Sequence, residues 1–202
     1  MRQSRLQDQH QQLGAIFEDT AGWSMPAHYG APAAEYAAVR DAVGLSDLSH
    51  RGKIQVTGDD RIKWLQSIIS NDILPLQPGQ GRYSSFLTHK GKMLGYFRVY
   101  VQADAVWVED VGEVGEATFQ ALRKFLLYGT NAKMENCGES WGLLLVSGPK
   151  SAEAVAAAFG IEVRALQLLH TLPATIGGQQ GLILRDLLER TDGLRFEVIS
   201  FT

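Results

Sequence analysis

The chain has 202 residues, of which 45% are hydrophobic and 20% charged, and its formal net charge is -3 at pH 7. This composition is typical of a globular protein with enough residues for a sizeable core, as one large domain or two small ones. Because no long run of like charge occurs, we expect neither a nucleic-acid-binding surface nor an anionic-membrane anchor.

The number of cysteines and the length of the apolar runs exclude further classes of protein. The single cysteine, Cys137, excludes an internal disulfide and a thiolate metal cluster made by this chain alone. Residues 1–14 are polar and lack the apolar segment of a signal peptide. Apolar runs such as 142–146 are too short to span a bilayer. We therefore expect a cytoplasmic, reducing compartment, no metal and no membrane partner.

The first part of the chain alternates between helical and irregular patterns. Residues 1–16 predict a polar helix with a thin apolar stripe, and the Gly-, Pro- and aromatic-rich residues 17–32 predict a loop. Helical spacing returns over 33–43, where alanines and a valine cluster on one side. Residues 53–56 alternate as a half-buried strand does, and 57–69 begin with an N-cap signal and continue at helical spacing.

The middle of the chain predicts a run of strands followed by a helix. Residues 71–81 contain breakers, and 83–87 and 92–101 predict two strands joined by a tight turn. A third strand is predicted at 105–109. Residues 114–128 place apolar side chains on one helical face.

The last part of the chain completes a mixed α+β pattern. Strands are predicted at 132–135 and 143–146, and Pro149 stands at a permitted early position of the next helix. Strands are also predicted at 182–185 and 196–201. The chain stops at the last of these, which would leave backbone groups unpaired in a fragment, unless this strand pairs normally and is simply the last.

Five segments of the chain form a recognisable set of motifs. They are AGWSMPAHYG at 21–30, EYAAVR at 35–40, GLSDLSHRGKIQVTG at 44–58, LQSIISNDILPLQPG at 65–79 and, more loosely, 83–96. In this order and spacing they resemble the glycine cleavage T-protein (aminomethyltransferase) superfamily. That superfamily binds tetrahydrofolate and includes folate-binding proteins that support iron–sulfur enzymes.

The resemblance implies a fold. It predicts an α+β T-protein-like fold of two entwined, ferredoxin-like subdomains. Residues 1–50 plus 140–202 would form a discontinuous subdomain, and residues 51–139 would form the inserted one. The C-terminal barrel that family members usually carry is absent from this chain.

The resemblance also suggests the groups that would hold a folate. The pyrimidine edge of a pterin suits a carboxylate that accepts two charge-assisted hydrogen bonds, and its ring suits an aromatic wall. Glu197 falls where the family has the pterin-binding Glu, although only Thr191, Phe196 and Glu197 of that segment match. Trp107 falls near a family Tyr that contacts folate. The alternatives are a solvent-facing Glu and a Trp of the core or of an edge strand.

The main departure from the family lies at Tyr96. Aminomethyltransferases of the family carry a pair of aspartates where this chain has Gly95 and Tyr96. A phenol does not supply the negative charge of a carboxylate at neutral pH. The family's Met after Ser-His is Arg51 here, which would either alter the pocket floor or face solvent. Tyr96 itself would border the folate or pack as an ordinary core aromatic.

Two further residues complete the predicted folate contacts. Asn71, in an Asn-Asp pair before a Pro-containing loop, would contact the pocket or only cap and turn the chain. Tyr83 would either lie on the strand that leads to the site or pack as a core tyrosine. We predict no catalytic residue.

Three functions remain open from the sequence. The first is a protein that binds tetrahydrofolate or a one-carbon derivative and belongs to the iron–sulfur maintenance branch. The second is an aminomethyltransferase that moves a one-carbon unit from a protein-bound aminomethyl group to tetrahydrofolate. The third is a non-catalytic interaction module. The expected partners are a folate and either a lipoylated carrier protein or iron–sulfur proteins.

Overall fold

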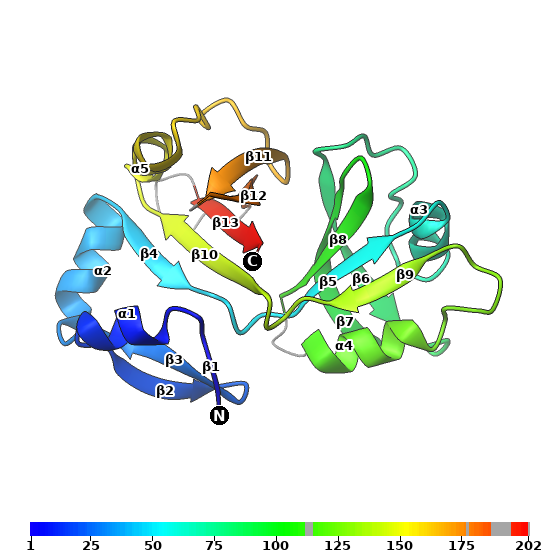
Figure 1. Cartoon of the computed structure of the whole chain (residues 1–202), viewed down its shortest axis with the longest axis horizontal. Coiled ribbons are helices and arrows are strands. Elements are labelled where there is room, and N and C mark those ends of the chain that lie inside the picture. Colours follow the sequence, from blue (N-terminus) through cyan, green and yellow to red (C-terminus); the bar gives the residue numbers. More distant parts are fainter. Residues whose placement is uncertain (112–114, 177, 187–194, 202) are drawn as a thin grey trace. The chain divides into compact units, whose positions relative to one another are not determined.

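The computed structural model describes residues 1–111, 115–176, 178–186 and 195–201 (Figure 1). The chain folds into two compact units. The discontinuous unit comprises Met1–His50 and Glu139–Thr202, and the inserted unit comprises Arg51–Gly138. Both units contain a five-stranded sheet with helices, which confirms the predicted α+β class.

The inserted unit is an antiparallel sheet with two helices. Its strands have the order β6-β7-β8-β5-β9. They are β5 (Lys53–Thr57), β6 (Gly81–Leu87), β7 (Met93–Val101), β8 (Ala105–Asp110) and β9 (Lys133–Asn136). The helices are α3 (Arg61–Gln66) and α4 (Gly115–Arg123).

One face of this sheet and the two helices form an apolar core. Side chains on a strand alternate between its two faces, so Val99 of β7 and Val108 of β8 lie on the face that also carries Phe97. Trp64 of α3 and Leu122 of α4 pack into the same cluster. The opposite face is left for the polar and aromatic side chains described below.

The discontinuous unit contains a second antiparallel sheet, with the order β11-β12-β13-β10-β4. Its strands are β4 (Gly44–Asp47), β10 (Trp141–Ser147), β11 (Thr171–Ile176), β12 (Gln179–Arg185) and β13 (Arg195–Phe201). Helix α5 (Ser151–Phe159) packs on it through Val155, against Ile183 and Phe196. The left-handed Gly160 ends α5 and donates its N–H to the carbonyl of Ala156.

The N-terminal residues add a small sheet of order β1-β3-β2 to this unit. It is built from β1 (Arg2–Gln3), β2 (Ile16–Thr20) and β3 (Trp23–His28), with helix α1 (Gln7–Gln12) between β1 and β2. Helix α2 (Pro32–Asp41) follows. None of its residues is buried, although its sequence gathers alanines on one side.

Two predictions for the N-terminus are wrong. The helix predicted over 1–16 covers only α1, and the loop predicted over 17–32 contains the β2–β3 hairpin. Ala21 and Gly22 both have positive φ, 52° and 83°, as a two-residue hairpin turn requires. Trp23 and Met25 alternate inward, a pattern that the Gly and Pro content of the segment obscured.

Other differences concern element ends and short strands. Helix α4 ends at Arg123, so Phe125 lies in the loop that follows and not on the predicted helical face. Strand β4 was not predicted because four residues show too little alternation. Strand β11 was not predicted because it contains Pro173, which is tolerated at its place on the sheet edge.

The strand predicted at 196–201 corresponds to β13, which pairs with β10 on one side and β12 on the other. The expectation that it pairs normally is therefore confirmed. In the described part of the chain, no helix is long and apolar enough to cross a membrane.

Candidate functional site

The second face of the inserted unit's sheet carries aromatic and charged side chains. Tyr96, Arg98 and Tyr100 follow one another at alternate positions of β7, and Trp107 and Glu109 do so on β8. The register places Arg98 opposite Glu109 and Tyr100 opposite Trp107. Residues that are distant in sequence therefore become neighbours on one face.

A buried ion triad lies on this face. The Oε1 atom of Glu109 accepts a hydrogen bond from Nη2 of Arg98 and another, at 3.2 Å, from Nη1 of Arg51. The side chains of Arg98 and Glu109 are 1% and 2% exposed, and that of Arg51 is 17% exposed. The alternative that Arg51 faces solvent is therefore wrong, because Arg51 forms an ion pair with the buried carboxylate of Glu109.

Two tyrosines stack beside the triad. The rings of Tyr83 and Tyr96 are nearly parallel, at 9°, with centroids 5.5 Å apart. The guanidinium carbon of Arg98 lies 6.0 Å from the centroid of the Tyr83 ring. Tyr96 remains 42% exposed, so its interpretation as a core aromatic is wrong. Tyr83 is half-buried, so it is not fully enclosed in the core, and its contact with a ligand stays a prediction.

Asn71 turns the chain and ties the loop to β6. Its Nδ2 donates to the carbonyl of Tyr83 at 2.8 Å, and its Oδ1 accepts from the N–H of Asp72 at 2.9 Å. Asp72 in turn accepts from the N–H of Leu74 at 3.1 Å. The predicted turn role is confirmed, and the contact with a ligand stays a prediction.

Trp107 and Glu197 lie on different units. Trp107, on β8 between β7 and β5, is 8% exposed, which agrees with a core residue and leaves its contact with folate a prediction. The backbone of Glu197 lies on β13, opposite Leu145 and Leu184. Its side chain lies outside the described residues, so its role also stays a prediction.

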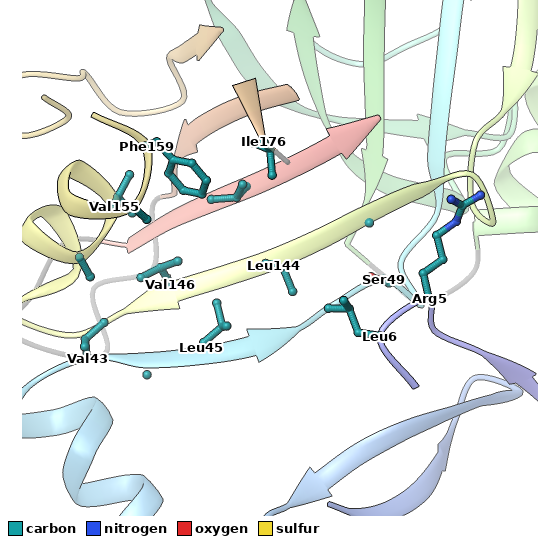
Figure 2. A pocket seen from close by; sticks show the side chains of 15 residues that line it. Arg5, Leu6, Val43, Leu45, Ser49, Leu144, Val146, Val155, Phe159 and Ile176 are labelled. Carbon is teal, nitrogen blue, oxygen red and sulfur yellow. The ribbon is translucent and has the colours of Figure 1, made fainter. Parts of the chain in front are cut away.

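The discontinuous unit contains an apolar cavity of about 530 Å³ (Figure 2). Leu45 of β4, Val146 of β10 and Phe159 of α5 line it, and Arg5 and Ser49 lie at one end. None of the residues predicted for the folate site borders it. The sequence does not indicate this cavity, because its walls come from segments spread between Arg5 and Val198.

A buried polar cluster ties the N-terminus of this unit to β4. Asp47 accepts hydrogen bonds from the hydroxyl of Ser4 and, at 2.8 Å, from the N–H of Ser49. Nε2 of His10 lies 3.0 Å from Asp47 Oδ2, and Nδ1 of His10 lies 2.7 Å from the Tyr29 hydroxyl. These contacts give Asp47 a structural role in this unit.

Titration of the cluster follows from burial and hydrogen bonding. Burial alone would raise the pKa of the Asp47 carboxyl, but hydrogen bonds from Ser4, Ser49 and His10 together lower it below the usual range. Burial, and then the negative charges of Asp47 and Glu35, raise the pKa of Tyr29. Tyr29 is therefore a neutral phenol at physiological pH and not an activated nucleophile.

No group of three or more His, Cys, Asp or Glu side chains within the described ranges is arranged to hold a metal ion. Cys137 is buried, and its Sγ lies 3.8 Å from the carbonyl oxygen of Glu135. The sheet face of the inserted unit offers ring stacking, hydrogen bonding and charge.

Comparisons with known proteins show the family of the chain. Residues 6–186 match the family model of the GCVT N-terminal domain. An aminomethyltransferase of Streptomyces coelicolor is 32% identical over 199 residues, which are 98% of this chain and 53% of that protein. A probable aminomethyltransferase of Halobacterium salinarum is 30% identical over 189 residues, covering 91% of this chain and 52% of that protein.

A solved structure extends the likeness to the fold. The crystal structure of glycine cleavage system aminomethyltransferase T from Bartonella henselae matches with a TM-score of 0.86 and 25% identity, over 98% of this chain and 53% of that one. The chain spans about half the length of these relatives. It belongs to the glycine cleavage T-protein (aminomethyltransferase) superfamily.

Proposed function

We propose that this chain forms the folate-binding part of a protein that binds tetrahydrofolate, or a one-carbon derivative, without transferring an aminomethyl group. The two units act as domains, with Trp107, Tyr83, Tyr96, Arg51 and Asn71 on the inserted one and Glu197 on the discontinuous one. The resemblance makes Glu197 the candidate for the edge of a pterin, and it makes the aromatic side chains of the inserted unit separate candidates for a ring contact. Membership of the superfamily supports folate as the ligand.

The observation that carries the loss of transfer chemistry is the environment of Tyr96. A cationic aminomethyl carbon needs a negative charge beside it as the transition state develops. The segment Met93-Leu94-Gly95-Tyr96-Phe97 contains no carboxylate. The phenol of Tyr96 is placed by ring stacking on Tyr83, and stacking supplies no such charge.

Glu109 does not replace the missing acid. It stands on the neighbouring strand, but Arg98 and Arg51 both donate to its Oε1 atom. Two guanidinium groups around one carboxylate leave no net negative charge for a cationic substrate. The positive charge of the two arginines therefore disfavours a cationic aminomethyl group beside the triad.

Calorimetric titration of the full-length protein with tetrahydrofolate tests ligand binding. We expect saturable binding with one site per chain. Failure of the protein to bind tetrahydrofolate or its methylene and formyl derivatives would contradict the proposal and leave the non-catalytic interaction module.

The second candidate function is aminomethyl transfer, and the names of the similar relatives favour it. An assay with an aminomethyl-loaded lipoyl carrier protein separates the two. We expect turnover roughly two to three orders of magnitude below that of an aminomethyltransferase such as the Streptomyces coelicolor relative, in line with the loss of one electrostatic group. Comparable turnover would establish the second candidate and refute the first.

We assign the protein to the iron–sulfur maintenance branch because a folate binder of this superfamily without transfer chemistry needs another use for its ligand. The specific activity of an iron–sulfur dehydratase in cells that lack the protein tests this assignment. We expect a fall that the wild-type protein restores and a Glu197→Ala variant does not. Unchanged dehydratase activity would remove the assignment without affecting folate binding.

A further inference from the structure

The apolar cavity of the discontinuous unit has one charged end (Figure 2). Of the 15 residues that line it in the described part of the chain, only Arg5 and Ser49 have polar side chains, and both lie at the same end. The register places Val146 of β10 opposite Leu45 of β4, so both project from one face of the sheet. Helix α5 packs on this face and contributes Phe159 to the lining. The walls therefore form a continuous apolar surface that ends at a cation.

The cavity is elongated along β4. Val43 lies at one end, and Ser49 and Arg5 lie at the other; the six residue steps from Val43 to Ser49 reach about 20 Å at most. Leu45 lies between these ends and is 62% exposed. An alkyl chain that lies along the strand would cover this side chain, and the gain grows with the apolar area removed from water.

Arg5 supplies the positive charge at the end of the cavity. Its Nε donates to the backbone carbonyl of Glu139 at 3.2 Å, and within the described ranges it forms no ion pair. The carboxylate of Glu139 is paired with Arg2, at 3.3 Å. The buried carboxylate of Asp47 is held by its own hydrogen-bond donors and does not line the cavity. The guanidinium of Arg5 therefore suits a carboxylate that a ligand brings.

We propose that this cavity binds an apolar monocarboxylate of the class of unbranched medium-chain fatty acids, with its alkyl chain along β4 and its carboxylate at Arg5. The inference does not depend on the proposed folate binding, because none of the residues predicted for the folate site borders the cavity. The cation selects an anionic head group. The apolar walls select an alkyl tail, since a polar tail would be buried there without hydrogen-bond partners.

Calorimetric titration of the full-length protein with octanoate, decanoate and dodecanoate, each below its micellar concentration, tests the binding of the chain. We expect one saturable site per protein and about fourfold tighter binding for each added methylene that enters the cavity. Decanol and decylamine carry the same chain with a neutral and a positive head group. Both should bind at least about threefold more weakly than decanoate, because neither forms an ion pair with Arg5.

Two variants with matched controls locate the ligand. Arg5→Gln removes the charge, and its control is Arg40→Gln, an exposed arginine of the same unit that is paired with Asp41 and lies outside the cavity lining. Ala158→Trp adds a ring to the lining from an exposed position of α5, and its control is Ala157→Trp, which is exposed and outside the lining.

We expect Arg5→Gln to bind decanoate roughly 3–10-fold more weakly than the wild type, the range of one charge-assisted hydrogen bond at an exposed rim. Ala158→Trp should abolish binding, because the added ring occupies the space of the alkyl chain. Both controls should keep the wild-type affinity. All four variants should keep the wild-type unfolding midpoint and affinity for tetrahydrofolate, so loss of folate binding is recorded separately from loss of decanoate binding.

Three results would overturn the inference. Equal affinity of the wild type and a folded Ala158→Trp variant for decanoate would place the ligand outside the cavity. Decanol bound as tightly as decanoate, with no effect of Arg5→Gln, would remove the carboxylate from the proposal. No binding of any of the three acids would reject it entirely, and self-association that Ala158→Trp abolishes would then assign the cavity to a second copy of the chain.

Discussion

Removal of the Glu109 carboxylate should destabilise the inserted unit strongly. Glu109 and Arg98 are 2% and 1% exposed, and Arg51 also donates to the same oxygen atom. Glu109→Ala would leave two guanidinium groups without this acceptor in a buried setting. Breaking a buried ion pair from one side costs about 3–5 kcal/mol, a large part of the ~5–15 kcal/mol that holds a domain folded.

A double-mutant cycle separates the loss of the pair from the loss of its packing. Arg98→Met should also cost about 3 kcal/mol, because it leaves the buried carboxylate only the 3.2 Å hydrogen bond from Arg51. The cycle compares Glu109→Leu and Arg98→Met with the Glu109→Leu/Arg98→Met double variant, which buries apolar groups of similar size and should cost at least about 2 kcal/mol less than the sum of those two single changes.

The assay combines urea unfolding with hydrogen exchange of the β7 and β8 amides, which reports on the inserted unit by itself. The matched control is Glu153→Ala, which removes the partner of Arg164 from a pair whose side chains are each 58% exposed. That change should stay within about 1 kcal/mol. Single changes at Glu109 and Arg98 that add within about 0.5 kcal/mol would refute the coupling inferred from the triad.

Three further predictions concern the ligand, the polar cluster and the backbone. Glu197→Ala should weaken tetrahydrofolate binding by about 1.5–3 kcal/mol if its carboxylate makes charged hydrogen bonds; unchanged calorimetric affinity would exclude it from the site. Because the folded-state pKa of Asp47 is lowered, its ionised form stabilises the fold above about pH 4 and loses this effect as pH falls through the lowered pKa. Asp47→Asn should therefore be less stable than wild type in urea at pH 7, and the difference should shrink in acid; a gap that is constant with pH would contradict this. Gly58→Ala should cost more than about 1 kcal/mol, because Gly58 has a φ of 97° and an added Cβ would lie 2.3 Å from the carbonyl oxygen of Asn131. The control, Gly142→Ala, meets its first neighbour at 3.9 Å and should leave the thermal midpoint nearly unchanged.

Much of the inserted unit could be predicted from the sequence because its signals are local. The alternation over β7 and β8 and the helical spacing of α3 are visible within a few residues. The hairpin at Ala21 and Gly22 was missed for the opposite reason. Its Gly, Pro and aromatic content is typical of loops, and the burial of Trp23 becomes apparent only when the small sheet has formed.

Some features of the candidate site could likewise be predicted from the sequence, and others depend on the tertiary structure. The sequence by itself identified the superfamily and the position of Tyr96, since both depend on the order and identity of residues along the chain. Only the tertiary structure decided that Tyr96 stacks on Tyr83 and that Arg51 faces a buried carboxylate. Arg51 and Glu109 are 58 positions apart. Their pairing depends on the register of antiparallel strands and on the cost of burying an uncompensated charge, and neither is recorded in local sequence.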